Sequence, residues 1–154
     1  MGNNDRMPKL QRVIEELPAG LDALRAEARA EGYLFVERLA TDWMSGTTRF
    51  DREGEALLAA RVSGVLAGIG GLTIEPVVPH ALRMRRFYVR LPYRRSGIGR
   101  KLVTALLEQA RSTSGLVTVN AGPASAAFWE SLGFTPDARD GHTHILQHDK
   151  RRLS

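Results

Sequence analysis

Two glycines among arginines, at the start of an amphipathic stretch, are the residues whose types and spacing point most directly to chemistry. Gly97 and Gly99 lie where a short loop passes into a helical pattern, and Arg94, Arg95 and Arg100 place positive charge around them. The first turn of a helix has backbone N–H groups without intrahelical partners and a partial positive charge, so it attracts anions. Glycine lets a large anion approach that backbone closely. The loop therefore predicts a cradle for a diphosphate.

Three kinds of diphosphate site begin in this way, and the spacing of the glycines separates them. The phosphate loop of nucleoside triphosphatases has the pattern G-x-x-x-x-G-K-[ST], which nothing in this loop fits. A dinucleotide fingerprint has G-x-G-x-x-G, but Leu102 stands at its third glycine position. Residues 94–99, RRSGIG, fit the pattern [QR]-x-x-G-x-[GA]. In this the segment resembles the acetyl-CoA-binding motif of the GNAT (GCN5-related) acetyltransferases.

A second segment late in the chain strengthens the resemblance. Residues 126–134, AAFWESLGF, are similar to the family's A-x-x-F-Y-E-x-x-G-F segment, and the resemblance covers about residues 9–148. The sequence departs from the family at Trp129, where a tyrosine usually protonates the leaving thiolate. An indole N–H donates a hydrogen bond but is no useful proton source. Tyr88 or a water would then take that role.

The resemblance also implies a set of cofactor-binding residues. In the family, two central parallel strands splay apart, and the pantetheine arm of acetyl-CoA pairs with one of them as an added peptide would. The residues so assigned are Tyr88, Val89, Arg94, Arg95, Ser96, Gly97, Ile98, Gly99, Arg100, Asn120 and Phe128. For Phe128, a place in the ordinary hydrophobic core is an equal alternative.

Catalysis requires a base, because a lysine-like amine has a pKa of about 10.4 and its protonated form has no lone pair. Glu75, at the end of a strand, is the candidate base, and its alternative is a solvent-exposed carboxylate beside Pro76. Tyr88 is the second catalytic candidate, and a strand N–H freed by a bulge would stabilise the oxyanion. His142 and His144 share a strand face by their spacing, but no third ligand is evident. No metal is predicted.

The elements that would position these groups follow from the apolar periodicity. Strands are predicted at residues 10–17, 56–62, 65–74, 82–90, 116–119, about 134 and 142–146, and helices at 19–31, 33–44, 98–111 and 124–132. A helix joins strand 82–90 to strand 116–119, so this pair is parallel in an otherwise antiparallel sheet. This order, of the α/β or α+β class, matches the GNAT fold.

Finer features of the strands can also be predicted. The apolar face of strand 82–90 changes parity, which predicts a β-bulge near Arg85 and Arg86. Ser63-Gly64 indicates a two-residue hairpin turn. The glycines at 68, 70 and 71 indicate a close approach, either by a ligand or by tight packing. Trp43, Phe50 and the polar loop 45–55 would border the acceptor pocket of such a fold.

Composition bounds the remaining questions. The 154 residues suit one domain, 1–154, with residues 1–8 as a flexible tail. The absence of cysteine excludes disulfides and a thiol nucleophile. There is no apolar run of roughly 18 residues and no signal peptide, so we expect no membrane span and a cytoplasmic location.

The charge leaves alternatives open. The net charge of +5 is concentrated in residues 83–101, a basic run that could indicate nucleic-acid binding. Aromatic residues make up only 6%, and no stacking platform is evident, so nucleic acid is unlikely as a partner. The leading hypothesis is an acetyl-CoA-dependent N-acetyltransferase acting on a small-molecule or peptide amine, as a monomer or homodimer. The alternative is a CoA-binding sensor or scaffold that has lost catalysis, as Trp129 would suggest.

Overall fold

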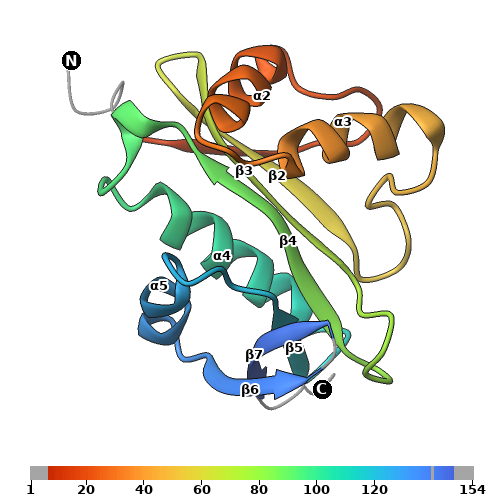
Figure 1. The fold of residues 1–154 in the computed structure, drawn as a ribbon. Helices are drawn as coiled ribbons and strands as arrows, with labels where there is room; N and C mark the ends of the chain where they lie inside the picture. Colours follow the sequence, from red (N-terminus) through yellow and green to blue (C-terminus); the bar gives the residue numbers. More distant parts are fainter. Residues whose placement is uncertain (1–6, 140, 148–154) are drawn as a thin grey trace.

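The fold is built on one twisted sheet between two layers of helices (Figure 1). The computed structural model describes residues 7–139 and 141–147. Seven strands pair in the order β1-β2-β3-β4-β5-β7-β6, and β4 and β5 are parallel. The strands are β1 (Lys9–Arg12), β2 (Ala56–Val62), β3 (Val65–Ile74), β4 (Leu82–Val89), β5 (Leu116–Val119), β6 (Thr135–Arg139) and β7 (His142–Gln147). This mixed, mostly antiparallel sheet confirms the predicted fold class.

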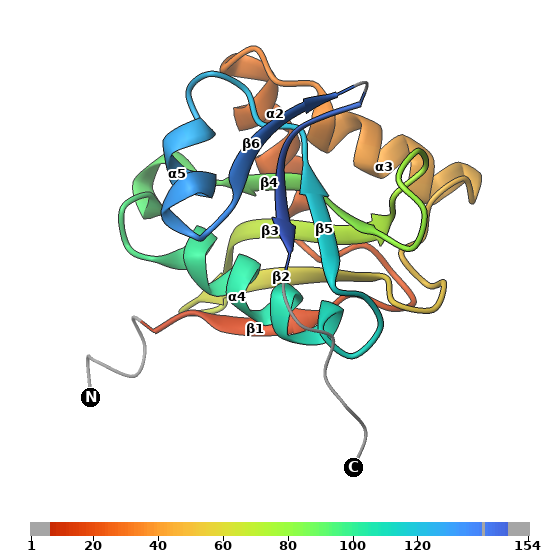
Figure 2. The same ribbon diagram turned by 90° about the horizontal axis from the view of Figure 1, so that it is seen from below.

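The helices divide between the two faces of the sheet. They are α2 (Leu21–Ala30), α3 (Phe35–Ser45), α4 (Ile98–Ala110) and α5 (Ala126–Ser131), with a short 3-10 helix η1 (Leu91–Tyr93). The apolar sides of α2 and α3 pack on one face, and those of α4 and α5 pack on the other. Figure 2 shows β5, β7 and β6 crossing β2, β3 and β4 at a steep angle. Within the described residues, no helix is long and apolar enough to span a membrane.

Strand β4 carries a bulge where the parity of its sequence changes. The pairing with β3 shifts between Ile69 and Gly71, so Gly70 alone faces Arg86 and Phe87. Arg86 has a φ of 64°, a left-handed conformation that a bulge can impose. Apolar side chains before and after the bulge therefore lie on the same face, toward α4. The predicted bulge is confirmed.

The glycines of β3 make room for aromatic rings. A Cβ added to Gly70 would overlap the ring of Phe87, and one added to Gly71 would overlap the ring of Phe50. Of the two explanations for these glycines, tight packing therefore holds at both positions. The hairpin between β2 and β3 is also confirmed, since Ser63 and Gly64 both have positive φ, as in a type I′ turn.

The first strand is shorter than predicted. Its register with β2 covers Lys9–Arg12, the Val13 N–H adds a bond to the Leu57 carbonyl at 2.9 Å, and Ile14 is mostly exposed. Val13 and Leu17 still pack against the core between the sheet and α2. Of the apolar residues in 10–17, Val13 and Leu17 reach the core, and only the first part of the segment forms a strand.

Candidate functional site

The start of α4 offers a run of backbone donors. The N–H groups of residues 95–100 donate to no acceptor in the described part of the chain, and the first bond of the helix is made by Lys101 to the Gly97 carbonyl. Gly97 and Arg95 have φ of 86° and 64°, and these left-handed residues turn the loop into the helix. An anion with several oxygens can accept such a run of N–H groups.

Packing holds this loop in place. Ile98 is only 2% exposed and anchors the first turn of α4 in the core. The Ser96 hydroxyl donates to the Tyr93 carbonyl, and Arg100 reaches Ser131 of α5 at 3.2 Å. Arg95 is exposed. The donors are therefore fixed before any ligand arrives, with positive charge at their border.

Strand β4 has an open edge next to this loop. Its pairing with β5 ends at Met84 and Val119, where β5 itself ends, whereas β4 continues to Val89. Figure 2 shows β5 turning away from β4. An extended ligand can therefore pair with the last residues of β4.

Backbone N–H and C=O groups alternate in direction along β4, and this alternation shows which of them face the open edge. Arg90 donates its N–H to the Ala67 carbonyl at 2.8 Å, on the β3 side. Because backbone groups of successive residues alternate in direction, the N–H and C=O of Val89 face the open side and those of Tyr88 face β3. The Val89 carbonyl already accepts Nε of Arg94 at 2.8 Å. The Val89 N–H is thus the better placed of the two predicted pantetheine contacts.

The side chain of Tyr88 belongs to a charged network with α2. Its hydroxyl donates to Glu31, and Arg94 donates to both Glu31 oxygens at 2.7 Å. The bonds from Arg94 and Tyr88 lower the pKa of Glu31, and burial together with Glu31 raises the pKa of Tyr88. A phenol that retains its proton so firmly is a weak general acid. The positive charge of Arg94 is also used by Glu31 and does not point toward the loop of residues 95–100.

Glu75, the predicted base, holds the turn after β3. It is 5% exposed, so the alternative of a solvent-exposed carboxylate is wrong. Its Oε2 accepts the N–H groups of Val77 and Val78 at 2.5 Å, and its Oε1 lies 3.5 Å from the Thr118 hydroxyl. Thr118 pairs with Arg83, three residues before the bulge. At about 3.3 Å per residue, the carboxylate lies roughly 10 Å from the bulge along β4.

Trp129, at the family's tyrosine position, fills the core. It is 4% exposed, and its ring meets those of Phe87, Phe128 and Phe134 edge-on with centroids 5.2, 5.2 and 5.3 Å away. Phe128 also packs on Gly99, where a Cβ would lie 3.3 Å from its ring. Phe128 therefore has a core contact and still borders the start of α4.

Asn120 lies directly after β5, at the point where the two strands separate. It is exposed, and its side chain has no hydrogen-bond partner among the described residues. The neighbouring backbone is held in place, since the Ala121 N–H donates to the Thr143 hydroxyl of β7 at 2.9 Å. Asn120 is thus positioned beside the open edge with its amide unused.

The two histidines of β7 each pair with a carboxylate. Nε2 of His142 lies 2.9 Å from Asp137, and Nε2 of His144 lies 2.8 Å from Glu130. The bond from His142 lowers the pKa of Asp137. No group of three His, Cys, Asp or Glu side chains in the described ranges is suited to a metal ion. The histidines therefore stabilise β7 against β6 and α5.

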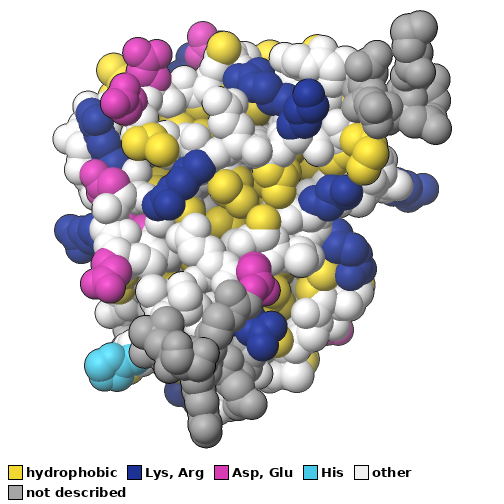
Figure 3. Space-filling model, turned by 180° about the vertical axis from the view of Figure 1, so that it is seen from behind, with side chains coloured by type: hydrophobic (Ala, Val, Ile, Leu, Met, Phe, Trp, Pro, Cys, Tyr) yellow, Lys and Arg dark blue, Asp and Glu magenta, His cyan; other side chains and the backbone are white. Residues whose placement is uncertain are grey.

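Acidic residues of α2 and α3, together with Glu31 directly after α2, neutralise part of the basic run. The pairs are Arg86 with Asp42 at 3.3 Å, Arg90 with Glu27 at 2.5 Å and Arg94 with Glu31 at 2.7 Å. Seen from behind in Figure 3, Lys and Arg side chains gather on the right of a hydrophobic area, and Asp and Glu lie mainly along the left edge. Nucleic-acid binding needs a row of unpaired positive side chains. These three ion pairs leave fewer unpaired arginines in residues 83–101.

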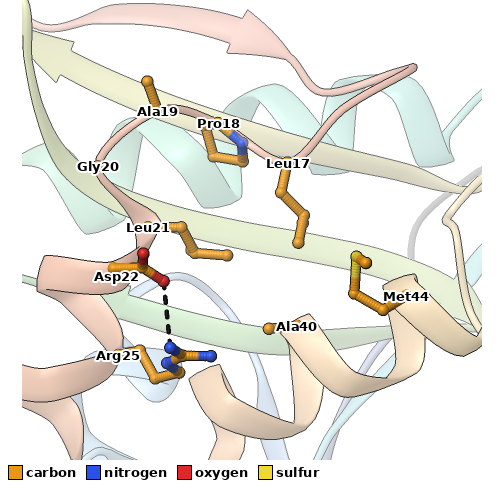
Figure 4. A pocket seen from close by; sticks show the side chains of 9 residues that line it. All are labelled: Leu17, Pro18, Ala19, Gly20, Leu21, Asp22, Arg25, Ala40 and Met44. Carbon is orange, nitrogen blue, oxygen red and sulfur yellow. Dashed lines mark ion pairs between the residues drawn. The ribbon is translucent and has the colours of Figure 1, made fainter.

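A hollow of ≈ 360 Å³ lies elsewhere, between α3 and the segment that leads into α2 (Figure 4). Its lining is Leu17, Pro18, Ala19, Gly20, Leu21, Asp22, Arg25, Ala40 and Met44. The two charged residues pair with each other at 3.2 Å. The hollow contains none of the predicted site residues.

Comparison with known proteins agrees with this geometry. The profile of the acetyltransferase (GNAT) family matches residues 20–134. The chain belongs to this family. A candidate acetyltransferase from Exiguobacterium sp. 255-15 superposes on it with a TM-score of 0.84 and 25% identity, covering 92% of this chain and 93% of that chain. The fold and the family are thus established together.

Two further GNAT structures show the same fold. YhbS, a GNAT family N-acetyltransferase from Escherichia coli solved with CoA, has a TM-score of 0.65 and 16% identity over 91% of this chain and 81% of its own. Glucosamine-6-phosphate N-acetyltransferase from Arabidopsis thaliana has a TM-score of 0.61 and 16% identity over 86% and 95%. A search of curated proteins gives no match.

Sequence reasoning missed the carboxylates on the helices. Glu31 meets Arg94, 63 residues later, and Asp42 of α3 meets Arg86 at the bulge, 44 residues later. No local motif signals either pair. Only the placement of α2 and α3 over β4 brings them together.

Proposed function

We propose that this protein is an acetyl-CoA-dependent N-acetyltransferase that transfers an acetyl group to the primary amine of an acceptor. The observation that supports this most is the run of unpaired N–H groups at residues 95–100, beside the open edge of β4. A helix start suits a diphosphate, and a strand edge suits the amide-rich pantetheine arm. Acetyl-CoA would supply a thioester that the amine attacks directly.

The residues of this chain then have distinct roles. The Val89 N–H orients the pantetheine arm, and Asn120 and Phe128 border it. An N–H at the bulge stabilises the oxyanion that forms on attack. Glu75 accepts the proton of the amine through water, using Oε1, because Oε2 is occupied by the turn. Thiols titrate near pH 8.5, so the departing thiolate needs no strong acid, and water suits this step better than Tyr88.

The CoA-binding sensor is the alternative that Trp129 raises, and the similarity to acetyltransferases does not favour it. Trp129 packs on Phe87 in the core, and an intact cradle suits a sensor as well as an enzyme, so turnover is the property that separates the two. We further propose one domain, supported by the single sheet, and a cytoplasmic protein that acts as a monomer or homodimer. Its acceptor would be a small-molecule or peptide amine.

Release of CoA tests the proposal. The protein is mixed with acetyl-CoA and a panel of primary amines, and free thiol is followed with a disulfide reagent. The chain has no cysteine, so every thiol detected is CoA. We expect amine-dependent release and an N-acetylated product by mass spectrometry. Tight binding of acetyl-CoA without acetylation of any amine in a broad panel would favour the sensor instead.

A further inference from the structure

Two arginines of β4 lie unpaired on the face of the sheet that α3 covers. Met84 packs toward α4, and since side chains alternate along a strand, Arg83 and Arg85 face the opposite side. Both are partly buried. Neither forms an ion pair or hydrogen bond with another residue in the described ranges, unlike Arg86, which meets Asp42 at 3.3 Å. Their charge is available to a ligand.

Two buried polar atoms lie next to these charges without partners. Thr73 of β3 pairs with Arg83 across the ladder and is 3% exposed. The Thr73 Oγ1 and the Arg83 Nε are both buried, and neither has a hydrogen-bond partner in the described part of the chain. Buried polar groups are costly unless they are hydrogen-bonded. Both atoms carry a hydrogen to donate, so a ligand oxygen can accept from both.

The charged groups around Arg83 and Arg85 leave this face of the sheet with a net positive charge. Burial lowers the pKa of Arg83 and of Arg86, and repulsion from Arg85 lowers both further. Of the nearby carboxylates, that of Asp42 pairs with Arg86, and that of Glu75 accepts two backbone N–H groups and also attracts Arg83, which partly offsets the lowering of the Arg83 pKa. A bound anion would relieve the repulsion among the arginines.

We propose that this arginine face, defined by Thr73, Arg83 and Arg85, binds an anionic group of the acceptor, so that the acceptor is a primary amine carrying a carboxylate or a phosphate. The inference rests on the proposed function. Arg85 directly precedes the bulge, and Arg83 lies roughly 7 Å further along the strand. The anion and the reacting amine are therefore only a few bonds apart, which selects compact acceptors.

Matched pairs of amines test this selectivity. The rates of CoA release are compared for O-phosphoethanolamine with ethanolamine, and for 4-aminobutyrate with butylamine. We expect kcat/KM to be about 10-fold or more higher for the anionic member of at least one pair, as charge-assisted hydrogen bonds would give. The pair that responds tells phosphate from carboxylate. Equal rates within both pairs would refute the inference while leaving the N-acetyltransferase function intact.

Variants locate the effect. Arg83→Gln and Arg85→Gln should each reduce the preference for the anionic amine about 10-fold, measured as the ratio of kcat/KM within a pair. Arg111→Gln is the matched control, because Arg111 is exposed at the far end of α4. Circular dichroism checks that each variant is folded. A preference that survives both substitutions would place the anion elsewhere.

A binding experiment separates the inference from catalysis. Saturating CoA occupies the cradle, and inorganic phosphate is then titrated at constant ionic strength while the melting temperature is followed. Phosphate should raise it in the wild type and in Arg111→Gln, but not in Arg83→Gln. An equal rise in Arg83→Gln contradicts the arginine face. If CoA alone has no effect, the proposed function fails, and the phosphate titration still tests the arginines.

Discussion

In the proposed function, the two sides of β4 would bind their ligands with different kinds of atoms. On the cofactor side, the donors are backbone N–H groups of Val89 and residues 95–100, which come from one continuous segment. On the acceptor side, the polar groups are side chains from β3, β4, β5 and α3, such as Thr73, Thr118 and Asp42. One side depends on the path of the main chain and the other on the chemistry of individual side chains.

This difference decides how each side responds to mutation. A backbone site is damaged only when the path, the space or the charge of the loop changes, so few substitutions matter and their effects are large. A side-chain site loses one group at a time, so its effects are smaller and depend on the substrate. The predictions below either sharpen this contrast or break it.

The largest effect is expected at Gly97. Its φ of 86° is strained for any other residue, and a Glu there would add negative charge to the diphosphate cradle. Two like charges 4 Å apart cost about 4 kcal/mol near a protein surface. Gly97→Glu should therefore weaken binding of CoA by about three orders of magnitude, measured by calorimetry, while the protein stays folded.

Gly46→Glu is the control for this variant. Gly46 has a φ of 80° and open space around it, and it ends α3 on the opposite face of the sheet. It has the same strain and the same added charge, far from the cradle. Micromolar binding of CoA retained in Gly97→Glu would contradict the cradle.

The next effect is expected at Glu75. Glu75→Gln keeps an oxygen for the turn but removes the base, so kcat/KM should fall about 100-fold or more. Glu55→Gln is the matched control, because Glu55 is also buried and accepts N–H groups of Arg52 and Ile74. Equal losses in the two variants would make Glu75 a structural residue only.

A smaller effect on stability is expected at Glu31, whose pKa is lowered in the folded state. A lowered pKa contributes stability that is fully present above the ordinary value of 4.5 and is lost as pH falls through the folded pKa. Glu31→Gln should thus cost about 1 kcal/mol at pH 7, after solvent screening, and progressively less as the wild-type carboxylate becomes protonated at acidic pH. Urea unfolding at several pH values measures this.

Glu37→Gln serves as the comparison for Glu31. It removes another ion pair, with Arg29 at 2.6 Å, that has no link to the cofactor loop. Glu31→Gln should weaken CoA binding slightly, since Arg94 connects Glu31 to that loop, and Glu37→Gln should not. If the two variants bind CoA with equal affinity, the Glu31 network has no effect on the cofactor side.

The smallest effect on activity is expected at Trp129. Its ring packs against three aromatic rings, so Trp129→Tyr should cost stability, about 1–2 kcal/mol by thermal unfolding. Turnover should be unchanged or higher, because a phenol restores a proton donor. A large loss of turnover in a folded variant would give Trp129 a role beyond packing.

The helix start and the bulge of the proposed cofactor side could be predicted from the sequence because their signals are local. The glycines at the start of α4 can be recognised without knowing any distant residue, and the change of parity in the apolar pattern of β4 predicts the bulge at Arg86. The acceptor side could not be predicted in this way. Asp42 and Glu31 look like ordinary surface acids of their helices, and their arginine partners come 44 and 63 residues later.

Two residues show where local patterns mislead. Ile14 continues the alternation of the first strand, yet its side chain is mostly exposed and the register with β2 ends at Arg12, followed by one hydrogen bond from the Val13 N–H to the Leu57 carbonyl. Trp129 stands at the position of a family tyrosine, and no local pattern indicated that its ring packs against Phe87 and Phe134. Both outcomes depend on long-range packing.

The most direct test is the thermal stability of the protein with and without acetyl-CoA, with NADH and ATP as controls. A ligand at a hundredfold its Kd adds about 2.7 kcal/mol, which is roughly 5–10 °C for a chain of this size. We predict a rise of that order with acetyl-CoA alone. An unchanged melting temperature in the folded protein would mean that the glycines only shape a helix start, and would contradict the proposed cofactor site.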